Sequence, residues 1–402
     1  MSFLTWLGFK PTAADLAHAM LKQLRRLGHS DWHYLAASNE LRNDRDAVVH
    51  LGNLALEYRQ APRGQRRALV EKYCSIADGL AKEVPKLWTM AQGAIYPILR
   101  SRWDQPLFAL HVRAQGHAPR SYSSRPLADS LCIRLVYDFG AGLAHIDDEL
   151  IDTWGQSFES ALEAAVANLR ALESPRWHAV DDGVYQLQSD VSYEESFVLL
   201  DRVRAALPFA DSAVFIACNR GVLLAASGAD DAALLRMIAL AEQSLHERPW
   251  PQSPELITQG DNGWQTFAAE GEAAMRAQEL MTQDRARIYD EQKYALEQIH
   301  EATEEDVFVA SCSLLRRDQD AGALRSWSTW SDGVLTLLPQ SDLVALARNL
   351  DRDGDPDVLF VSWDKLQQVC AARLTAEPLD PPRYRTDGFP SQEEWERLAE
   401  RV

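Results

Sequence analysis

The sequence predicts an α+β protein in which mixed and antiparallel sheets pack against helices. Runs of alternating or β-branched apolar residues lie between segments whose apolar residues are three and four positions apart, so strands and helices are interspersed along the chain. Hydrophobic residues make up 46% of the chain, which is enough for packed cores. The length of 402 residues exceeds the usual size of one core and predicts more than one domain.

Residues 1–100 form the first predicted region, with helices around a β-hairpin. We expect a helix from about 12 to 27 and a second one over 66–84, because both segments repeat apolar residues at helical spacing. Two β-rich runs, 32–42 and 47–60, are separated by a polar N-D-R-D turn. The pattern of 86–101 predicts that helix continues toward Pro97.

Residues 101–266 form the second predicted region, an α+β body. Segment 130–151 predicts two strands around the turn F-G-A-G, and a helix follows from Ser157, a residue type favoured at helix N-caps. Strand and helix patterns then alternate to the end of the region. The remaining expected elements are a strand at 183–190, a helix at 193–207, a strand pair at 212–227 with the turn C-N-R-G, and a helix at 230–248.

The third predicted region is a connecting helix over 267–302, which is long, polar and free of proline. Apolar residues recur every seven positions along it: Phe267, Ala274, Met281, Ile288 and Ala295. The alternative is a coiled-coil seam that joins two copies of the chain. The second column of such a seam contains the acidic residues Glu270, Asp284 and Glu291, which favours the connecting helix.

Residues 303–402 predict a C-terminal β-rich module with an antiparallel meander. Short strands are expected at 306–315, 324–330, 333–339, 342–348 and 357–363. A helix follows from Asp364 through Leu374. The chain ends in a helix with Ser391 as N-cap and Glu394 completing a capping box.

Charge and cysteine content restrict the functional classes. The formal net charge of −18 repels nucleic-acid phosphates and anionic membrane surfaces, and favours a basic protein partner. The five cysteines are widely spaced and form no C-x-x-C motif, which is typical of a reducing compartment. The first residues lack the pattern of a signal peptide, and no apolar stretch approaches membrane-spanning length. We therefore expect a cytoplasmic protein that binds neither nucleic acid nor membrane.

An acidic turn at residues 349–360, N-L-D-R-D-G-D-P-D-V-L-F, resembles a calcium loop. Asn349, Asp351, Asp353 and Asp357 offer oxygen atoms around Gly354, as calcium requires. The twelfth position is Phe360 instead of the glutamate of an EF-hand, and the chain continues as a strand. The favoured interpretation is a solvated turn that joins two strands. Calcium is the alternative, and the sequence predicts no other cofactor.

Other candidate groups have favoured structural interpretations. His29 and His33 have the spacing of two metal ligands on a helix but lack the H-E-x-x-H glutamate, so surface or packing roles are expected. Cys218 precedes Asn219 and Arg220, but no general base accompanies it, so a buried thiol is favoured over a nucleophile. Asn168 borders the apolar face of its helix, and we expect its amide to bind a neighbouring strand; a ligand contact is the alternative.

Charges are unevenly distributed in the central region. Six arginines stand against two acids between Arg100 and Arg134, whereas 138–169 holds seven acids and no lysine or arginine. The favoured interpretation is that these segments attract each other within the fold. The alternative is an acidic docking surface for a basic protein.

Several short motifs in residues 12–270 resemble the YtpQ-like family of uncharacterised bacterial cytoplasmic proteins. They are Y-P-I-L-R-S, R-L-V-Y-D, I-D-D-E-L-I-D-T-W-G, A-V-A-N-L, S-Y-E-E-S and F-I-A-C-N-R-G-V-L. The resemblance implies partner or ligand contacts at Arg100, Asp138, Asn168, Tyr193, Asn219 and Arg220. Cys218 and Gly221 depart from the family pattern, where proline and aspartate stand. The resemblance implies no activity, and the C-terminal module lies outside it.

Three functional hypotheses follow. The first is a non-enzymatic interaction protein whose acidic surface binds a basic protein, for example an immunity or defence-associated protein that neutralises a basic toxin. The second is a hydrolase or small-ligand-binding enzyme with a pocket near Asp138, Asn168 and Arg220. The third is a scaffold that forms homo-oligomers through the 267–302 helix. Since no P-loop, G-x-S-x-G elbow or dinucleotide fingerprint is present, the sequence favours the first.

Overall fold

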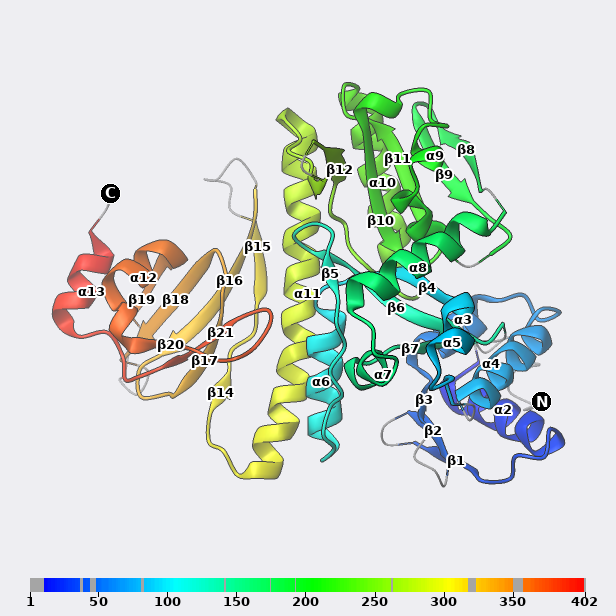
Figure 1. Cartoon of the computed structure of the whole chain (residues 1–402). Helices are drawn as coiled ribbons and strands as arrows, with labels where there is room; N and C mark the ends of the chain where they lie inside the picture. The colour runs from blue at the N-terminus through cyan, green and yellow to red at the C-terminus, as the bar shows by residue number, and fades with distance from the viewer. Residues whose placement is uncertain are drawn as a thin grey trace. The chain divides into compact units, whose positions relative to one another are not determined.

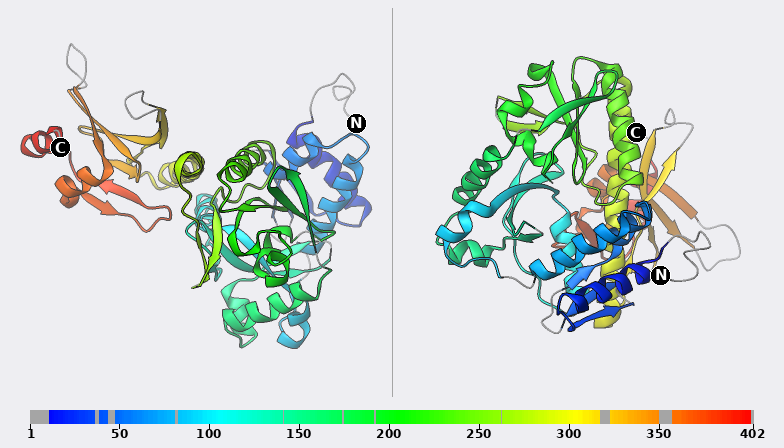
Figure 2. Two further views of the ribbon diagram at one scale, coloured as in Figure 1. Left: turned by 90° about the horizontal axis from the view of Figure 1, so that it is seen from above. Right: turned by 90° about the vertical axis from the view of Figure 1, so that its right-hand side faces the viewer.

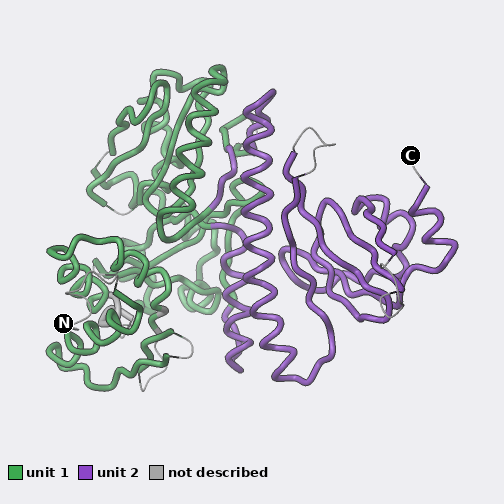
Figure 3. The backbone as a smooth tube through the Cα atoms, turned by 180° about the vertical axis from the view of Figure 1, so that it is seen from behind, with its two compact units in different colours: residues 1–100, 121–252, 257–265 green, residues 101–120, 253–256, 266–402 purple. Residues whose placement is uncertain are grey.

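The computed structural model divides the chain into two compact units, which Figure 3 colours separately. Unit 1 comprises residues 1–100, 121–252 and 257–265, and unit 2 comprises residues 101–120, 253–256 and 266–402. Segment 101–120 thus belongs to unit 2 together with the long helix. The structure describes residues 11–36, 39–43, 48–80, 83–140, 142–173, 175–191, 193–261, 263–316, 323–349 and 357–400.

The N-terminal part of unit 1 packs helices around a three-stranded antiparallel sheet. Its elements are α2 (Ala13–Arg26), β1 (Trp32–Leu35), β2 (Glu40–Asn43), β3 (Val48–His50), α3 (Gly52–Gln60) and α4 (Arg66–Leu80). Figure 2 shows the N-terminal helices α2 and α4 lying side by side, and Leu16, Met20 and Tyr73 are buried in their common core. The predicted helices at 12–27 and from residue 66 are confirmed.

Residues 52–60 form helix α3, where the sequence predicted a continuing strand. The strand β3 ends at His50, and the following N-L-A-L-E-Y-R-Q is rich in good helix formers. Leu54 and Ala55 are the buried residues of α3. Val48 and Val49 favour a strand, and the prediction wrongly extended that strand through residue 60. The predicted polar turn at 44–47 lies outside the described residues, but β2 and β3 on either side of it pair antiparallel, with Leu41 opposite Val49.

Residues 95–101 form strand β4 (Ile95–Ser101), where the sequence predicted the end of a helix. The helix is limited to α5 (Trp88–Ala91) and the 3-10 turn η1 (Gln92–Ala94). Pro97 explains the difference, because proline cannot donate the hydrogen bond of a helix interior. The strand β4 lies beside β6 in a four-stranded sheet whose other members are β5 and β7.

The elements that follow β4 in this part of unit 1 are β5 (Arg125–Pro126), β6 (Leu131–Asp138), β7 (Leu143–His145), α7 (Asp148–Thr153) and α8 (Phe158–Ala171). Helix α8 packs on the sheet that contains β4, as the sequence predicted, whereas the end of the predicted strand segment 130–151 and the residues after it form helix α7, begun by the N-cap Asp147. The predicted N-cap Ser157 is confirmed, because its side chain accepts a hydrogen bond from the Ser160 N–H at 3.1 Å. Ala161, Leu162 and Leu169 of α8 are buried in the core of unit 1.

A six-stranded sheet completes unit 1, with the order β13-β12-β10-β11-β9-β8. Its elements and their connections are β8 (Arg176–Asp181), β9 (Val184–Gln188), η2 (Glu194–Leu199), α9 (Asp201–Arg204), η3 (Ala210–Ser212), β10 (Ala213–Asn219), β11 (Val222–Ser227), α10 (Asp231–Glu247), β12 (Ile257–Gly260) and β13 (Gly263–Thr266). Figure 1 shows α10 alongside β10 and β11. The predicted strand pair at 212–227 is confirmed as the antiparallel pair β10 and β11.

Unit 2 contains the long helix α11 (Gly271–Thr303) and the shorter α6 (Asp104–Ala114), which pack together. Two members of the predicted seven-residue column are covered within this unit. Ile288 packs against Trp103 and Leu107, and Ala295 packs in a cluster with Leu110. The predicted connecting helix is thus present, and this part of the column is not exposed for a second copy of the chain.

The rest of unit 2 consists of two four-stranded sheets with small helices. Its elements are β14 (Phe308–Val309), β15 (Ser313–Arg316), β16 (Leu324–Ser331), β17 (Thr336–Pro339), β18 (Leu343–Arg348), β19 (Asp357–Ser362), α12 (Trp363–Cys370), η5 (Ala371–Arg373), β20 (Leu374–Ala376), β21 (Arg383–Thr386) and α13 (Gln392–Ala399). Most neighbours are antiparallel as predicted, but two pairs run parallel: β14 with β17, and β16 with β18, between which β17 leaves to join the other sheet. The predicted capping box of Ser391 and Glu394 is present.

Candidate functional site

Strands β6 and β7 place charged side chains on one face of the sheet in unit 1. Side chains two positions apart on a strand share a face, so Arg134, Val136 and Asp138 lie on the same side of β6. Val136 pairs with His145 of β7 in antiparallel register. Because directly opposed residues of an antiparallel pair point to the same side, His145 joins Arg134 and Asp138 on that face.

A buried ion pair ties strand β4 to η2. The Arg100 guanidinium lies 3.2 Å from Glu195 Oε1, and the two side chains are only 6% and 3% exposed. Glu195 Oε2 accepts a hydrogen bond from the Gly221 N–H at 2.9 Å. The same carboxylate therefore holds both Arg100 and the turn between β10 and β11. Gly221 adopts a φ of 73°, a left-handed conformation that glycine takes without strain.

Two tyrosines connect the same strands to η2. The Tyr193 hydroxyl donates to Asp138 Oδ2 at 2.5 Å, and the Gly140 N–H donates to Asp138 Oδ1 at 2.6 Å. Tyr96 stacks on Tyr193 with ring centroids 4.9 Å apart. Burial and the hydrogen bond to Asp138 raise the pKa of Tyr193, so its hydroxyl stays protonated and acts as a donor.

Arg220 is positioned by a buried amide network. Asn219 is fully buried; its amide donates to the Pro249 carbonyl at 3.2 Å, and its oxygen accepts from the Ser244 hydroxyl at 2.8 Å. These contacts hold Trp250 in a left-handed conformation with a φ of 63°, which is rare for a large side chain. The Arg220 guanidinium lies 4.3 Å from the centre of the Trp250 ring, a cation–π contact.

Arg134 differs from the other buried arginines. Arg134 is only 8% exposed, and its Nε–H has no hydrogen-bond acceptor. It makes no hydrogen bond or ion pair with any residue that the structure describes. Arg383 of unit 2 is the contrast, because its guanidinium is fully buried and donates to Gln292 Oε1 and to the carbonyls of Ala310, Leu337 and Tyr289.

His145 experiences the charges of three arginines. The residue as a whole retains contact with solvent, although protein surrounds its ring. Desolvation by the surrounding protein, followed by the positive charges of Arg100, Arg220 and Arg134, lowers the pKa of His145 well below its usual range. The imidazole is therefore neutral at physiological pH. We call Arg100, Arg134, Asp138, His145, Tyr193, Glu195 and Arg220 the polar cluster; all belong to unit 1.

The polar cluster includes four of the six family-motif residues and leaves out two. Arg100, Asp138, Tyr193 and Arg220 belong to it, and Asn219 holds the Trp250 platform beside it. Asn168 has separate partners, because its amide donates to the Gln92 and Ile95 carbonyls at 2.7 and 2.9 Å. These two bonds tie α8 to η1 and β4, which is the structural role that the sequence favoured.

Cys218 is unsuited to nucleophilic chemistry in the folded protein. It is fully buried, and burial raises its pKa to about 11. The other four cysteines are also buried and free. His29 and His33 do not lie on one helix, because His33 belongs to strand β1 and His29 precedes that strand. Among the described residues, no three His, Cys, Asp or Glu side chains gather as metal ligands.

The strands β18 and β19 on either side of the acidic turn pair antiparallel, whereas residues 350–356 of the turn itself lie outside the described residues. Arg348 at the end of β18 pairs with Asp357 at the start of β19. The Asn349 amide donates to Asp357 Oδ2 at 2.6 Å, and the Arg348 guanidinium lies 3.3 Å from the same carboxylate. Two of the four candidate calcium ligands thus contact each other beside a cation. Asp351 and Asp353 lie outside the described residues.

Several acidic side chains of residues 138–169 form hydrogen bonds or ion pairs within the fold. Asp147 is the N-cap of α7, and Asp148 accepts from the Ser121 hydroxyl and the Ser123 N–H. Glu159 forms an ion pair with Arg125 at 3.2 Å. This last pair joins the acidic stretch to the arginine-rich one, as the favoured interpretation of their charges expected.

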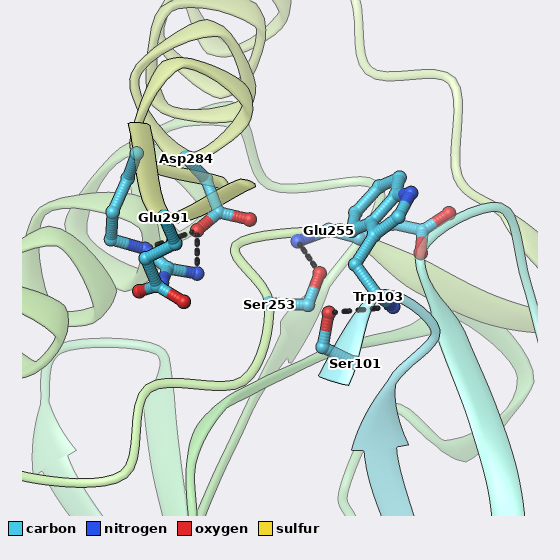
Figure 4. Close-up of polar contacts among 7 residues, drawn as sticks. Ser101, Trp103, Ser253, Glu255, Asp284 and Glu291 are labelled. Atoms are coloured by element: carbon cyan, nitrogen blue, oxygen red, sulfur yellow. Dashed lines mark hydrogen bonds and ion pairs between the residues drawn. The ribbon is translucent and has the colours of Figure 1, made fainter. Parts of the chain in front are cut away.

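A second set of buried polar groups lies in unit 2 and is shown in Figure 4. Asp284 is 7% exposed, and its Oδ1 accepts two hydrogen bonds from Arg287, which also binds Glu291. On the neighbouring segment the Ser253 hydroxyl accepts from the Glu255 N–H at 3.0 Å. Asp284 and Glu291 are the acids that argued against a coiled-coil seam, and their shared arginine accounts for their presence on α11.

Sequence reasoning missed Arg134, His145, Glu195 and Trp250. Arg134 had a detectable signal, because it is a charged residue inside the otherwise apolar run L-C-I-R-L-V-Y. Glu195 had none, since nothing distinguishes it from Glu194 beside it. The left-handed backbone of Trp250 lies beside the buried Asn219 amide, which bonds to the Pro249 carbonyl, a contact between residues distant in the sequence.

Comparisons with models of known protein families, with curated proteins and with solved structures give no match. The resemblance to the YtpQ-like family therefore remains a prediction. No helix within the described part of the chain combines the length and the apolar character needed to cross a membrane.

Proposed function

We propose that the protein is a non-enzymatic interaction protein that binds a basic protein partner through an acidic surface on unit 2. The observation that carries this proposal is the acidic end of α11, defined as Glu301, Glu304 and Asp306. All three side chains are exposed, and none forms an ion pair with a residue that the structure describes. Neighbouring Glu305, in contrast, forms an ion pair with Arg385 at 2.7 Å.

The position of these carboxylates is unfavourable for the isolated fold. The C-terminus of a helix carries partial negative charge and is stabilised by cations, so Glu301 and Glu304 oppose the helix dipole. A basic partner would relieve this repulsion. The net charge of −18 would also attract such a partner from a distance and accelerate its association.

Exposed aromatic rings accompany the acidic end of α11. Tyr294 is 59% exposed and lies two turns before Glu301 on the same helix face, and Phe308 is 49% exposed. Lys293 Nζ lies 5.4 Å from the centre of the Phe308 ring, which shows that this ring accepts a cation. Carboxylates beside aromatic faces are suited to arginine and lysine side chains of a partner.

An immunity or defence-associated role that neutralises a basic toxin is one form of this proposal. The enzyme alternative has less support, because Asn168 binds backbone carbonyls and Cys218 is a buried thiol. No functional assignment by homology adds to either hypothesis.

Affinity capture from the native host at low salt tests the proposal. The tagged full chain is compared with Glu301→Gln/Glu304→Gln/Asp306→Asn and with the control Asp190→Asn/Asp211→Asn/Asp261→Asn. The control residues are exposed acids of unit 1, so both variants lose the same charge. We expect the wild type and the control to retain a basic protein that the α11 variant loses. Retention by all three proteins would contradict the proposal.

A further inference from the structure

Arg134 and Arg100, the buried arginines of the polar cluster, have guanidinium nitrogens that no described acceptor satisfies. Arg134 is nine-tenths buried and has no acceptor among the described residues. The Nε of Arg100 is also buried without an acceptor, although its other guanidinium nitrogen binds Glu195 and the Leu99 carbonyl. Buried guanidinium groups are normally paired or fully hydrogen-bonded. Two unsatisfied guanidinium nitrogens in one region are suited to an anion as their acceptor.

The acidic groups of the region are engaged elsewhere. Both Glu195 oxygens are used, one by Arg100 and one by the Gly221 N–H. Both Asp138 oxygens are used, by the Tyr193 hydroxyl and the Gly140 N–H. Glu194 lies near the turn at Gly221, and burial and the Glu195 charge raise its pKa to about 7, with no arginine acting to lower it. Glu194 is therefore not the partner of Arg134.

The cluster is open to solvent on one side. His145 and Arg220 are exposed, whereas Arg100 and Arg134 lie deeper. Arg134 and His145 lie on one face of the β6–β7 pair, and the Glu195 carboxylate ties Arg100 to the turn that carries Arg220. The charges of all three arginines act on His145. Arg220 is fixed by its stacking on Trp250, and Arg100 by its ion pair with Glu195. The donors are thus held in place before any ligand arrives, which favours binding.

We propose that Arg134, Arg100 and Arg220, with His145 at the rim, form a binding site in unit 1 for the phosphate group of a small molecule. Guanidinium groups present paired N–H donors that match phosphate oxygens. Arg134 supplies a positive charge that no described acid balances, and Arg100, whose charge Glu195 balances, adds an unsatisfied Nε–H donor. A carboxylate carries one charge and two oxygens, and would satisfy a single guanidinium. The site is distinct from the acidic end of α11 and does not depend on the protein partner.

Thermal unfolding of the full chain at constant ionic strength tests this site, with inorganic phosphate, glycerol phosphate or acetate as the added anion. A ligand that binds only the folded state raises the unfolding temperature, and a concentration of about 100 times Kd raises it by several degrees. We expect a rise with phosphate and none with acetate. A larger rise with glycerol phosphate assigns an organic phosphate, and equal rises assign free phosphate. No rise with either phosphate would overturn the proposal.

Arg134→Met is the decisive variant, and Arg125→Met is its control on the neighbouring strand β5. Removing an unpaired buried charge does not weaken a fold. We therefore expect Arg134→Met to unfold at or above the wild-type temperature without phosphate and to lose the phosphate-dependent rise. Arg220→Gln, at an exposed position, should weaken phosphate binding by about tenfold in calorimetry, as loss of a charged hydrogen bond does. A phosphate response retained in both variants would overturn the assignment.

Discussion

Arg100 and Glu195 form a buried ion pair at 3.2 Å, and the second oxygen of Glu195 binds the Gly221 N–H. Three segments that are distant in the sequence, β4, η2 and the β10–β11 turn, are thus joined through one carboxylate. This relationship places Arg100 and Arg220 in the same region of unit 1. It also makes Glu195 the most sensitive acidic residue of the polar cluster.

Glu195→Gln should destabilise the protein by about 3–5 kcal/mol, because it leaves the Arg100 guanidinium buried without a counter-charge. Urea unfolding monitored by circular dichroism measures the loss. The double variant Arg100→Met/Glu195→Leu should recover part of it, since no unpaired charge remains. A Glu195→Gln protein as stable as the wild type would show that the pair does not hold these segments together.

Glu194→Gln should change stability in a pH-dependent way. Burial and the neighbouring Glu195 charge raise the pKa of Glu194 to about 7, above its unfolded value of 4.5. The group thus contributes stability below pH 4.5 that is lost as pH rises through about 7. The glutamine variant should exceed the wild type by about 1–3 kcal/mol at pH 8 and match it at pH 4. Equal stability curves between pH 4 and 8 would be inconsistent with this environment.

Asn168→Ala should cost about 1–3 kcal/mol of unfolding free energy, because two backbone carbonyls lose their donor. The same variant should leave phosphate binding unchanged, since Asn168 is not part of the polar cluster. Calorimetry on the stable fraction checks the second point. Loss of ligand affinity without loss of stability would instead support the ligand contact that the family resemblance implies.

Arg383→Met should be among the most damaging single changes in unit 2. The Arg383 guanidinium donates to four acceptors, the carbonyls of Ala310, Leu337 and Tyr289 and the Gln292 side chain. Without these hydrogen bonds we expect the free energy of unfolding to fall by at least about 3 kcal/mol, since each buried acceptor left without a donor is destabilising. The contrast with Arg134→Met, which should not destabilise, separates a structural arginine from a binding one. Similar losses in both variants would contradict that distinction.

Calcium should not change the unfolding temperature. Asn349 and Asp357 are bonded to each other beside Arg348, so the Asp357 carboxylate is already engaged. Unfolding scans with about 1 mM Ca²⁺ and with EDTA, alongside Asp351→Asn/Asp353→Asn, measure this; a site with Kd near 10 μM would raise stability by about 2.7 kcal/mol. A calcium-dependent rise that the double variant loses would establish a metal loop.

The sequence predicts much of the fold where local signals are strong. The helix after Ser157 and the strand pair around Asn219 and Arg220 follow from N-capping and from the glycine of the turn. Prediction failed where a short apolar run was ambiguous, as in the α3 segment after Val49 and in β4 around Pro97. Local periodicity cannot distinguish a buried strand from a short helix there.

The candidate site was only partly predictable. The family resemblance pointed to Arg100, Asp138, Tyr193 and Arg220, which the fold gathers around η2. The position of Asn168 at the border of the apolar helix face had already indicated a structural tie, but nothing in the sequence could indicate that Arg134 would lack a partner. That property depends on which residues distant in the sequence come within hydrogen-bonding distance.

The central claim, that the acidic end of α11 binds a basic partner, is tested most directly with a labelled deca-arginine peptide in fluorescence anisotropy. The α11 variant and the unit 1 control carry the same net charge, so general attraction cancels between them. Neutralising three carboxylates worth about 0.3–0.5 kcal/mol each should weaken binding by about tenfold in the α11 variant. The control should stay close to the wild type. Equal losses in the two variants would contradict the claim.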